Sequence, residues 1–105
     1  MANEAKSKGN VAFSSGNYEE AIKHFFEAIA LAPTNHVLYS YRSAAYASLH
    51  KYSEPLQDAK KTAEIKADWS KGYSRLGAAY VGLGKYDDAI SSYKKAWSLI
   101  LRIKH

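Results

Sequence analysis

The 105-residue sequence contains no cysteine, so neither a disulfide bond nor a thiolate metal site can form within it. It has no apolar run approaching the roughly 18 residues of a membrane span, and residues 1–6 are polar, unlike the apolar core of a signal peptide. Lysine and arginine never occur more than two in succession, which disfavours nucleic acid as a partner. From these absences we expect a cytoplasmic protein that neither crosses a membrane nor binds nucleic acid.

The sequence also lacks the motifs that support catalysis or cofactor binding. Gly82-Leu83-Gly84 is not followed by the Lys-Ser/Thr pair of a phosphate-binding loop, and no serine lies in a nucleophile-elbow motif. No two histidines share a predicted helix at metal-ligand spacing; the four are His24, His36, His50 and His105. We therefore expect no enzymatic activity, no cofactor and no metal. The net charge of +5 indicates either an ordinary solvated surface or a preference for an acidic partner.

What the sequence does contain is a repeat with a period of 34 residues. The positions in phase are Gly9, Ser43 and Gly77; Ala12, Tyr46 and Tyr80; Tyr18, Tyr52 and Tyr86; and Ile22, Leu56 and Ile90. Small, aromatic and aliphatic residues at these offsets resemble the tetratricopeptide repeat (TPR), a helix-turn-helix unit. The resemblance implies one all-α domain over residues 1–105, a TPR solenoid. Its three repeats cover 2–35, 36–69 and 70–103, with about six antiparallel helices in a right-handed superhelix.

Local signals predict where the helices begin and end. Gly16-Asn17 and residues 82–85 end the first helix of a hairpin, and Pro33 ends the second. The predicted helices cover about 3–15, 18–32, 36–49, 52–65, 70–83 and from 86 onward. Pro55 occupies the place of Ala21 and Ala89 in the other repeats. Because proline is tolerated only in the first helical turn, we expect the fourth helix to start late or to be locally distorted.

The last predicted helix carries more apolar residues than one inward stripe needs. Helical spacing predicts an inward face of Tyr86, Ala89, Ile90 and Tyr93. Further along, that face continues through positions 93, 96, 97, 100 and 103–104, which leaves Leu99 and Leu101 off it. No proline or glycine follows Gly84, so the helix is expected to continue past Leu99. The surplus apolar surface predicts either a homodimer through this C-terminal helix or a tail folded back over the fifth helix.

Polar residues of the first and fifth predicted helices indicate an anion site. Lys6 and Asn10 are four residues apart and share a helix face with Phe13, and Lys71 and Arg75 share a face in the same way. Ammonium, amide and guanidinium donors that converge on one concave surface can bind a carboxylate. The alternative is that these residues are ordinary exposed charges.

Longer phrases carry a second, more specific resemblance. Residues 6–10, 34–40, 42–47 and 68–79 are similar to the N-terminal TPR domain of the Hop/Sti-type heat-shock organising co-chaperones, above all the plant members. The resemblance implies stress-response binding to the C-terminal Glu-Glu-Val-Asp of the 70-kDa or 90-kDa heat-shock chaperones through a two-carboxylate clamp. The matching clamp positions are Lys6, Asn10, Lys71 and Arg75. The matching apolar positions, which would receive an aliphatic side chain, are Phe13, Ala44 and Ala47.

One clamp position departs from the family pattern. The family has asparagine where this sequence has Tyr41, inside the stretch 39–43. A tyrosine hydroxyl also donates a hydrogen bond, but from further out, and its ring is large enough to fill the floor of the groove. The leading expectation is recognition of a chaperone peptide at a site that includes Tyr41. The alternative is a self-associating structural TPR module whose peptide binding is impaired.

Overall fold

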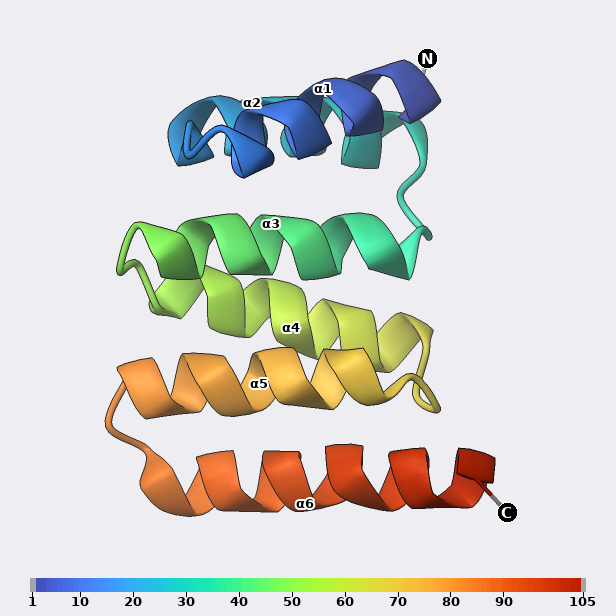
Figure 1. The fold of residues 1–105 in the computed structure, drawn as a ribbon, viewed down its shortest axis with the longest axis vertical. Coiled ribbons are helices and arrows are strands. Elements are labelled where there is room, and N and C mark those ends of the chain that lie inside the picture. Colours follow the sequence, from blue (N-terminus) through green and yellow to red (C-terminus); the bar gives the residue numbers. More distant parts are fainter. Residues whose placement is uncertain (1, 105) are drawn as a thin grey trace.

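The computed structural model describes residues 2–104, which form three helical hairpins stacked in a row (Figure 1). The helices are α1 (Ala2–Ser14), α2 (Tyr18–Leu31), α3 (His36–Ser48), α4 (Ser53–Ile65), α5 (Ser70–Gly82) and α6 (Tyr86–Lys104). Each helix begins and ends within about one residue of its predicted bounds, and the described residues contain no strand. The all-α architecture predicted from the repeat is therefore confirmed.

The turns inside the hairpins use one backbone geometry at three equivalent positions. Gly16, His50 and Gly84 follow the first helix of each hairpin and have φ angles of 80°, 58° and 75°. This left-handed conformation closes the helix end, because the next N–H can reach back, as from Lys51 to the Tyr46 carbonyl at 3.1 Å. Glycine adopts the conformation without strain, whereas a residue with a Cβ such as His50 does so at a cost of about 1–2 kcal/mol.

Helix α4 begins one residue later in its repeat than α2 and α6 do. The aromatic residue that opens those helices has its equivalent in Tyr52, which lies outside α4; the helix begins at Ser53. Pro55 is then the third helical residue, where a backbone N–H would have no intrahelical partner, so its missing donor leaves the ladder intact. Its carbonyl accepts a hydrogen bond from the Ser43 hydroxyl at 3.0 Å. The late start predicted from the proline is confirmed.

The first and third hairpins are each closed by a glycine of the first helix that faces an aromatic ring of the second. The pairs are Gly9 with Phe25 and Gly77 with Tyr93. A Cβ built on Gly9 would lie 2.6 Å from the Phe25 ring, and one on Gly77 would lie 2.6 Å from the Tyr93 ring. Both distances are shorter than carbon atoms can approach, so a residue larger than glycine at either position would force the opposing ring to move. In the middle hairpin the position of the aromatic residue is taken by Ala59, and the position of the glycine is taken by Ser43.

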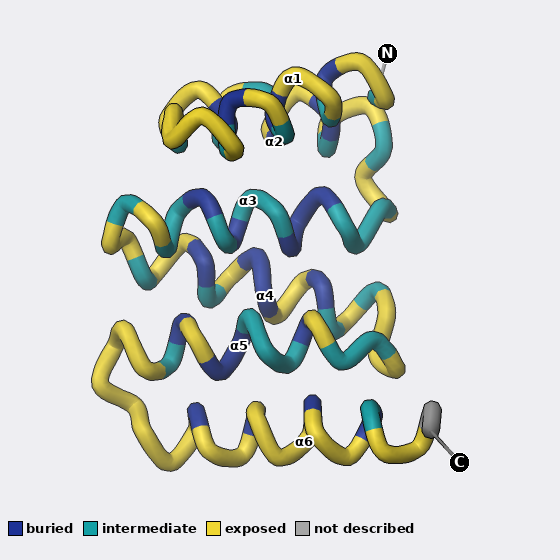
Figure 2. The backbone as a smooth tube through the Cα atoms, in the orientation of Figure 1, coloured by how far each residue is buried: buried dark blue, intermediate teal, exposed yellow. Residues whose placement is uncertain are grey.

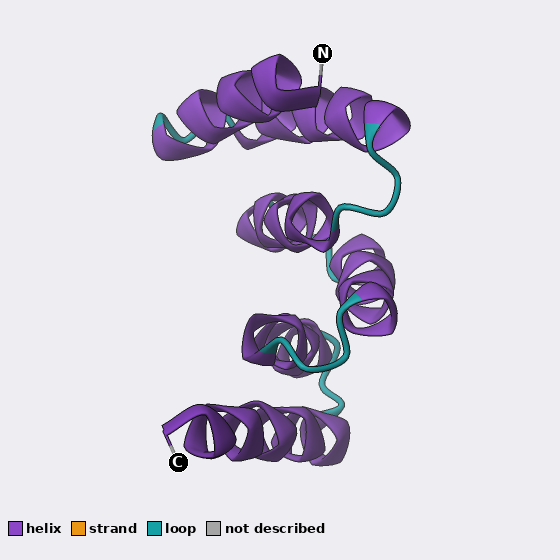
Figure 3. Ribbon diagram, turned by 90° about the vertical axis from the view of Figure 1, so that its right-hand side faces the viewer, coloured by secondary structure: helices purple, strands orange, loops and turns teal. Residues whose placement is uncertain are grey.

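Helix packing is mainly local along the chain. Each helix packs against its neighbours in sequence, and α3 also contacts α5. Figures 1 and 3 together show α3 and α5 on one side of the stack and α4 on the other. A buried hydrophobic cluster lies in the first hairpin and α3 and contains Ala5, Ala12, Ala21, Phe25, Ala28, Leu38 and Ala45. In the middle hairpin, Arg42 of α3 binds both carboxylate oxygens of Asp58 in α4 at 2.8 and 2.7 Å.

Helix α6 extends to Lys104, as predicted, and buries Ala89 and Ala96 of the predicted face, but the rest of its buried face differs from the prediction. The buried residues are Ala89, Ser92, Ala96 and Leu99. Leu99, predicted to lie off the packed face, is 5% exposed, whereas Tyr86, Ile90, Tyr93 and Trp97 are 43–64% exposed. Small residues bring α6 close to α5 and displace the bulky ones to its flank, which explains the error. Leu101 is exposed as predicted, and the side chains at positions 103 and 104 lie outside the described part.

Candidate functional site

All eight predicted site residues lie on the first helix of a hairpin, that is, on α1, α3 or α5. We call the surface formed by these three helices the first-helix face. Figure 1 shows these three helices on the nearer side of the stack. Lys71 is exposed, and the other seven residues are half-buried; the complete set is Lys6, Asn10, Phe13, Tyr41, Ala44, Ala47, Lys71 and Arg75. Half-burial is expected of side chains that line a shared face between helices rather than the core.

Arg75 is the half-buried cation of this face. Its Nε donates a hydrogen bond to the hydroxyl of the buried Ser40 at 3.3 Å, which holds α5 against α3. Burial lowers the pKa of the Arg75 guanidinium from its usual value, and the nearby Tyr41 hydroxyl partly opposes that shift. Within residues 2–104, no carboxylate lies within ion-pair distance of Arg75. A guanidinium with terminal N–H donors left over can receive an incoming anion.

Arg42, on α3, shows the opposite arrangement to Arg75 on α5. Its two bonds to Asp58 form a bidentate pair whose side chains are 17% and 6% exposed. Hydrogen bonding to that carboxylate raises the pKa of the Arg42 guanidinium despite partial burial. Arg42 is therefore a structural cation, and of the two arginines on the first-helix face only Arg75 lacks a carboxylate in the described structure.

Lys71 extends the cationic surface by one turn of α5. Its Nζ lies 5.8 Å from the ring centroid of Trp69, and the Trp69 ring makes an edge contact with His36 at 4.7 Å. Sequence reasoning missed Trp69 and Ser40, the two residues that hold the predicted cations in place. The available signal was their position, because Trp69 comes two residues before Lys71 and Ser40 comes directly before Tyr41.

Tyr41 belongs to both the core and the face. Its ring packs against the cluster of the first hairpin, 5.7 Å from the Phe25 ring centroid. Phe13 packs on the same cluster and makes an edge contact with Tyr18 at 5.3 Å. The Tyr41 ring thus fills space between α2 and α3, while its hydroxyl is close enough to Arg75 to affect its pKa.

Acidic residues are almost absent from the first-helix face. Of the ten acidic residues, only Glu4 lies on α1, α3 or α5, and it contacts Lys8 at 3.6 Å. Eight others lie on the second helices: Glu19, Glu20, Glu27, Glu54, Asp58, Glu64, Asp87 and Asp88. This segregation gives the first-helix face a positive potential, which favours an anionic ligand.

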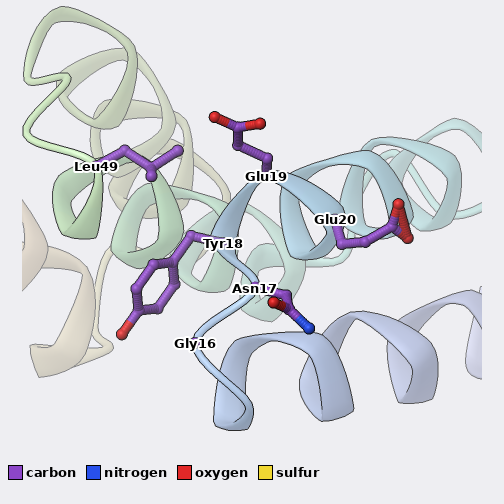
Figure 4. A pocket seen from close by; sticks show the side chains of 6 residues that line it. All are labelled: Gly16, Asn17, Tyr18, Glu19, Glu20 and Leu49. Carbon is purple, nitrogen blue, oxygen red and sulfur yellow. The ribbon is translucent and has the colours of Figure 1, made fainter.

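The eight candidate residues line none of three hollows with a measurable volume. One of about 290 Å³ lies between α1 and α2 and is lined by Glu4, Ala5, Lys8, Glu27 and Leu31. Another of about 420 Å³ lies at the turn of the first hairpin and is lined by Gly16, Asn17, Tyr18, Glu19, Glu20 and Leu49 (Figure 4). A similar hollow of about 440 Å³, lined by Gly84–Asp88, lies at the equivalent turn of the third hairpin. Because it recurs at the same point of the repeat, this hollow follows from the turn geometry and is not a specialised site.

Residues 2–104 contain no group of three or more histidine, aspartate or glutamate side chains placed to hold a metal ion. None of their helices combines the length and the apolar character that crossing a bilayer requires.

Sequence and structure comparisons agree on the family. The sequence matches the tetratricopeptide repeat family over residues 2–35 and again over residues 70–100. The first TPR domain of Spaghetti (RPAP3), solved with the HSP90 peptide SRMEEVD, is 34% identical with a TM-score of 0.91, over 93% of this chain and 78% of that one. The chain belongs to the tetratricopeptide repeat family.

The relatives of this TPR domain also bear out the more specific resemblance. This chain is 64% identical over 99 residues to the Hsp70-Hsp90 organizing protein of Triticum aestivum. The aligned region covers 94% of this chain and 17% of that relative. The TPR2B domain of yeast Sti1, solved in complex with pHsp70, has a TM-score of 0.94 and 27% identity, over 98% of this chain and 82% of that one. The Hop/Sti-type resemblance is confirmed, for a TPR domain that spans 17% of the wheat relative's length.

Proposed function

We propose that this TPR domain is a non-catalytic, cytoplasmic co-chaperone module that binds the acidic C-terminal peptide of 70-kDa or 90-kDa heat-shock chaperones. The observation that carries the proposal is Arg75, a half-buried guanidinium without a carboxylate partner in residues 2–104. A cation removed from water needs a counter-charge, and an anionic ligand would supply the one that Arg75 lacks.

A peptide ending in Glu-Glu-Val-Asp has the complementary chemistry. Its carboxylates, including the terminal one, would be bound by Lys6, Asn10, Lys71 and Arg75, and the fork of the guanidinium suits a carboxylate best. Its valine would contact the apolar part of the face, formed by Phe13, Ala44 and Ala47. Tyr41 would form the floor, with its hydroxyl directed toward the bound carboxylate beside Arg75.

Two related domains support this assignment. The first TPR domain of RPAP3 is bound to an HSP90 peptide that ends in Glu-Glu-Val-Asp, and TPR2B of yeast Sti1 is in complex with pHsp70. The wheat relative is named an Hsp70-Hsp90 organizing protein. The cationic first-helix face of this chain matches the charge of such peptides.

Calorimetric titration with the peptide SRMEEVD tests the proposal. Arg75→Ala should weaken binding by roughly 10- to 100-fold, as expected for a charge-assisted hydrogen bond worth about 1.5–3 kcal/mol. A matched pair on α1 separates specific contact from general charge: Lys6→Ala should weaken binding, whereas Lys8→Ala, which removes the same charge from a residue already beside Glu4, should change it little. Raising the salt concentration should weaken binding by screening.

The decisive control uses the same peptide with an amidated C-terminus. The clamp predicts a clear loss of affinity, because one carboxylate is removed while every side chain is kept. If the amidated peptide binds as tightly as the free acid, then Arg75 does not hold the terminal carboxylate and this assignment is wrong.

A further inference from the structure

One flank of α6 carries an apolar stripe that the other described helices leave largely exposed, which we call the α6 seam. Its members are Tyr86, Ile90, Tyr93, Trp97 and Leu101, all 39–64% exposed. Figure 2 shows that the buried positions of α6 lie on the side toward α5, while the other side forms the end of the stack. Contiguous exposed apolar surface of this kind marks an interaction site, unlike single exposed residues.

The spacing of the seam matches a coiled coil. Tyr86, Ile90, Tyr93 and Trp97 are separated by steps of 4, 3 and 4 residues, the pattern in which apolar side chains insert between those of a second helix. The half-buried Ile100 continues the pattern three residues further on. A seam with this period fits a helix that has the same period, and α6 of another copy meets that requirement.

The exposed area is sufficient for a dimer of moderate strength. If a fully exposed large side chain presents about 200 Å², the five members at 39–64% exposure present roughly 500 Å². Two such faces bury about 1,000 Å² between them, and the flanking residues raise the total toward the 1,200 Å² at which specific interfaces begin. Micromolar association is therefore expected, rather than an obligate dimer.

Charge at the edge of the seam specifies the orientation of the second helix. Asp87 and Lys94 are exposed, lie on the same flank one residue after Tyr86 and Tyr93, and make no ion pair in the described structure. In an antiparallel pair related by a two-fold axis, Asp87 faces the partner's Lys94 and Lys94 faces the partner's Asp87. One two-fold contact thus forms both opposite-charge pairs.

We propose that a second copy of this chain covers the α6 seam, with the two α6 helices antiparallel about a two-fold axis. The seam lies on the last helix of the stack and contains none of the residues assigned to peptide binding. The dimer therefore leaves the first-helix face available for a peptide. The dimer proposal does not depend on the proposed peptide binding.

Sedimentation equilibrium of the 105-residue chain between about 5 and 100 μM tests the proposal, because micromolar association predicts a mass that rises from monomer to dimer over this range. Trp97→Lys should weaken the dimer at least tenfold, whereas Ser98→Lys adds the same charge to the neighbouring exposed position and should leave it intact. Circular dichroism checks that both variants remain helical, and SRMEEVD binding should be unchanged in both. A monomer at 100 μM, or a dimer insensitive to Trp97→Lys, overturns the proposal.

Orientation is tested separately by cross-linking, which is simple because the chain has no cysteine. Under mild oxidation, a mixture of Asp87→Cys and Lys94→Cys chains should form a disulfide-linked dimer faster than either variant alone. Asp87→Cys chains that cross-link with one another as fast as the mixture does would rule out the antiparallel arrangement. The charge exchange gives a second readout: Asp87→Lys should weaken the dimer, and adding Lys94→Asp should restore it.

Discussion

The two glycines that contact aromatic rings provide a matched experiment on packing. Changing glycine to alanine inside a helix stabilises it by about 1 kcal/mol if nothing obstructs the new methyl group. At Gly9 the added Cβ meets three ring atoms of Phe25 at 2.6–3.0 Å, and Phe25 is 0% exposed inside the buried cluster of the first hairpin. Overpacking of this kind costs about 1–3 kcal/mol, so Gly9→Ala should be destabilising by up to about 2 kcal/mol.

In Gly77→Ala the added Cβ would clash in the same way if the ring stayed in place, because it would lie 2.6–2.8 Å from Tyr93 ring atoms. Here the ring is 43% exposed and can turn toward solvent, so the gain in helix propensity offsets most of the cost. We expect this variant to lie within about 0.5 kcal/mol of the parent chain. At about 4–8 °C per kcal/mol for a domain of this size, the two variants should differ in Tm by roughly 10 °C.

Thermal unfolding followed by circular dichroism measures the difference, with urea unfolding as a check on free energy. Combining Gly9→Ala with Phe25→Leu should recover part of the loss, because the smaller side chain makes room for the methyl group. If Gly9→Ala and Gly77→Ala have equal Tm values, then exposure of the opposing ring does not determine the cost and the reasoning fails.

Three further substitutions have definite expected outcomes. Asp58→Ala leaves Arg42 without its carboxylate and should lower the free energy of unfolding in urea by about 3 kcal/mol, the lower end for a buried pair because Arg42 keeps some solvent contact. His50→Gly removes a Cβ from a left-handed position and should raise that free energy by up to about 1 kcal/mol; a lower value would show that the His50 contact with Tyr52 outweighs the strain. Tyr41→Asn should tighten SRMEEVD binding about tenfold in calorimetry, and an unchanged affinity would show that the tyrosine is compatible with the site.

The features predicted correctly from the sequence are those that act within a few residues of where they occur. Gly16 ends a helix through its own backbone conformation, and Pro55 delays one through its own missing donor. The period of 34 residues then extends such local signals to the whole stack. The eight candidate residues were predicted from helical spacing together with the resemblance to the co-chaperone domains, and all eight lie on α1, α3 or α5.

What the sequence could not provide depends on contacts between helices. Leu99 and Trp97 exchanged their predicted environments because the fit against α5, not the count of apolar residues, determines which side of α6 is buried. The pair formed by Arg42 and Asp58 joins residues 16 apart, and nothing in the chain marks them as partners. Without that pairing, Arg75 could not be recognised as the arginine of α1, α3 and α5 that lacks a carboxylate in the described structure.

Local packing along the stack also affects how the chain folds and opens. Its main contacts join neighbouring helices and none of them joins α1 to α5 or α6, so sequence separations are short and folding should be fast, in the microsecond to millisecond range. The same arrangement lets the first and last hairpins open separately, at free energies below that of global unfolding. A peptide bound by Lys6 on α1 and Arg75 on α5 would link the first and last hairpins directly, whereas within the chain these two hairpins are linked mainly through the middle one. Its binding should therefore slow amide hydrogen exchange at both ends of the stack together.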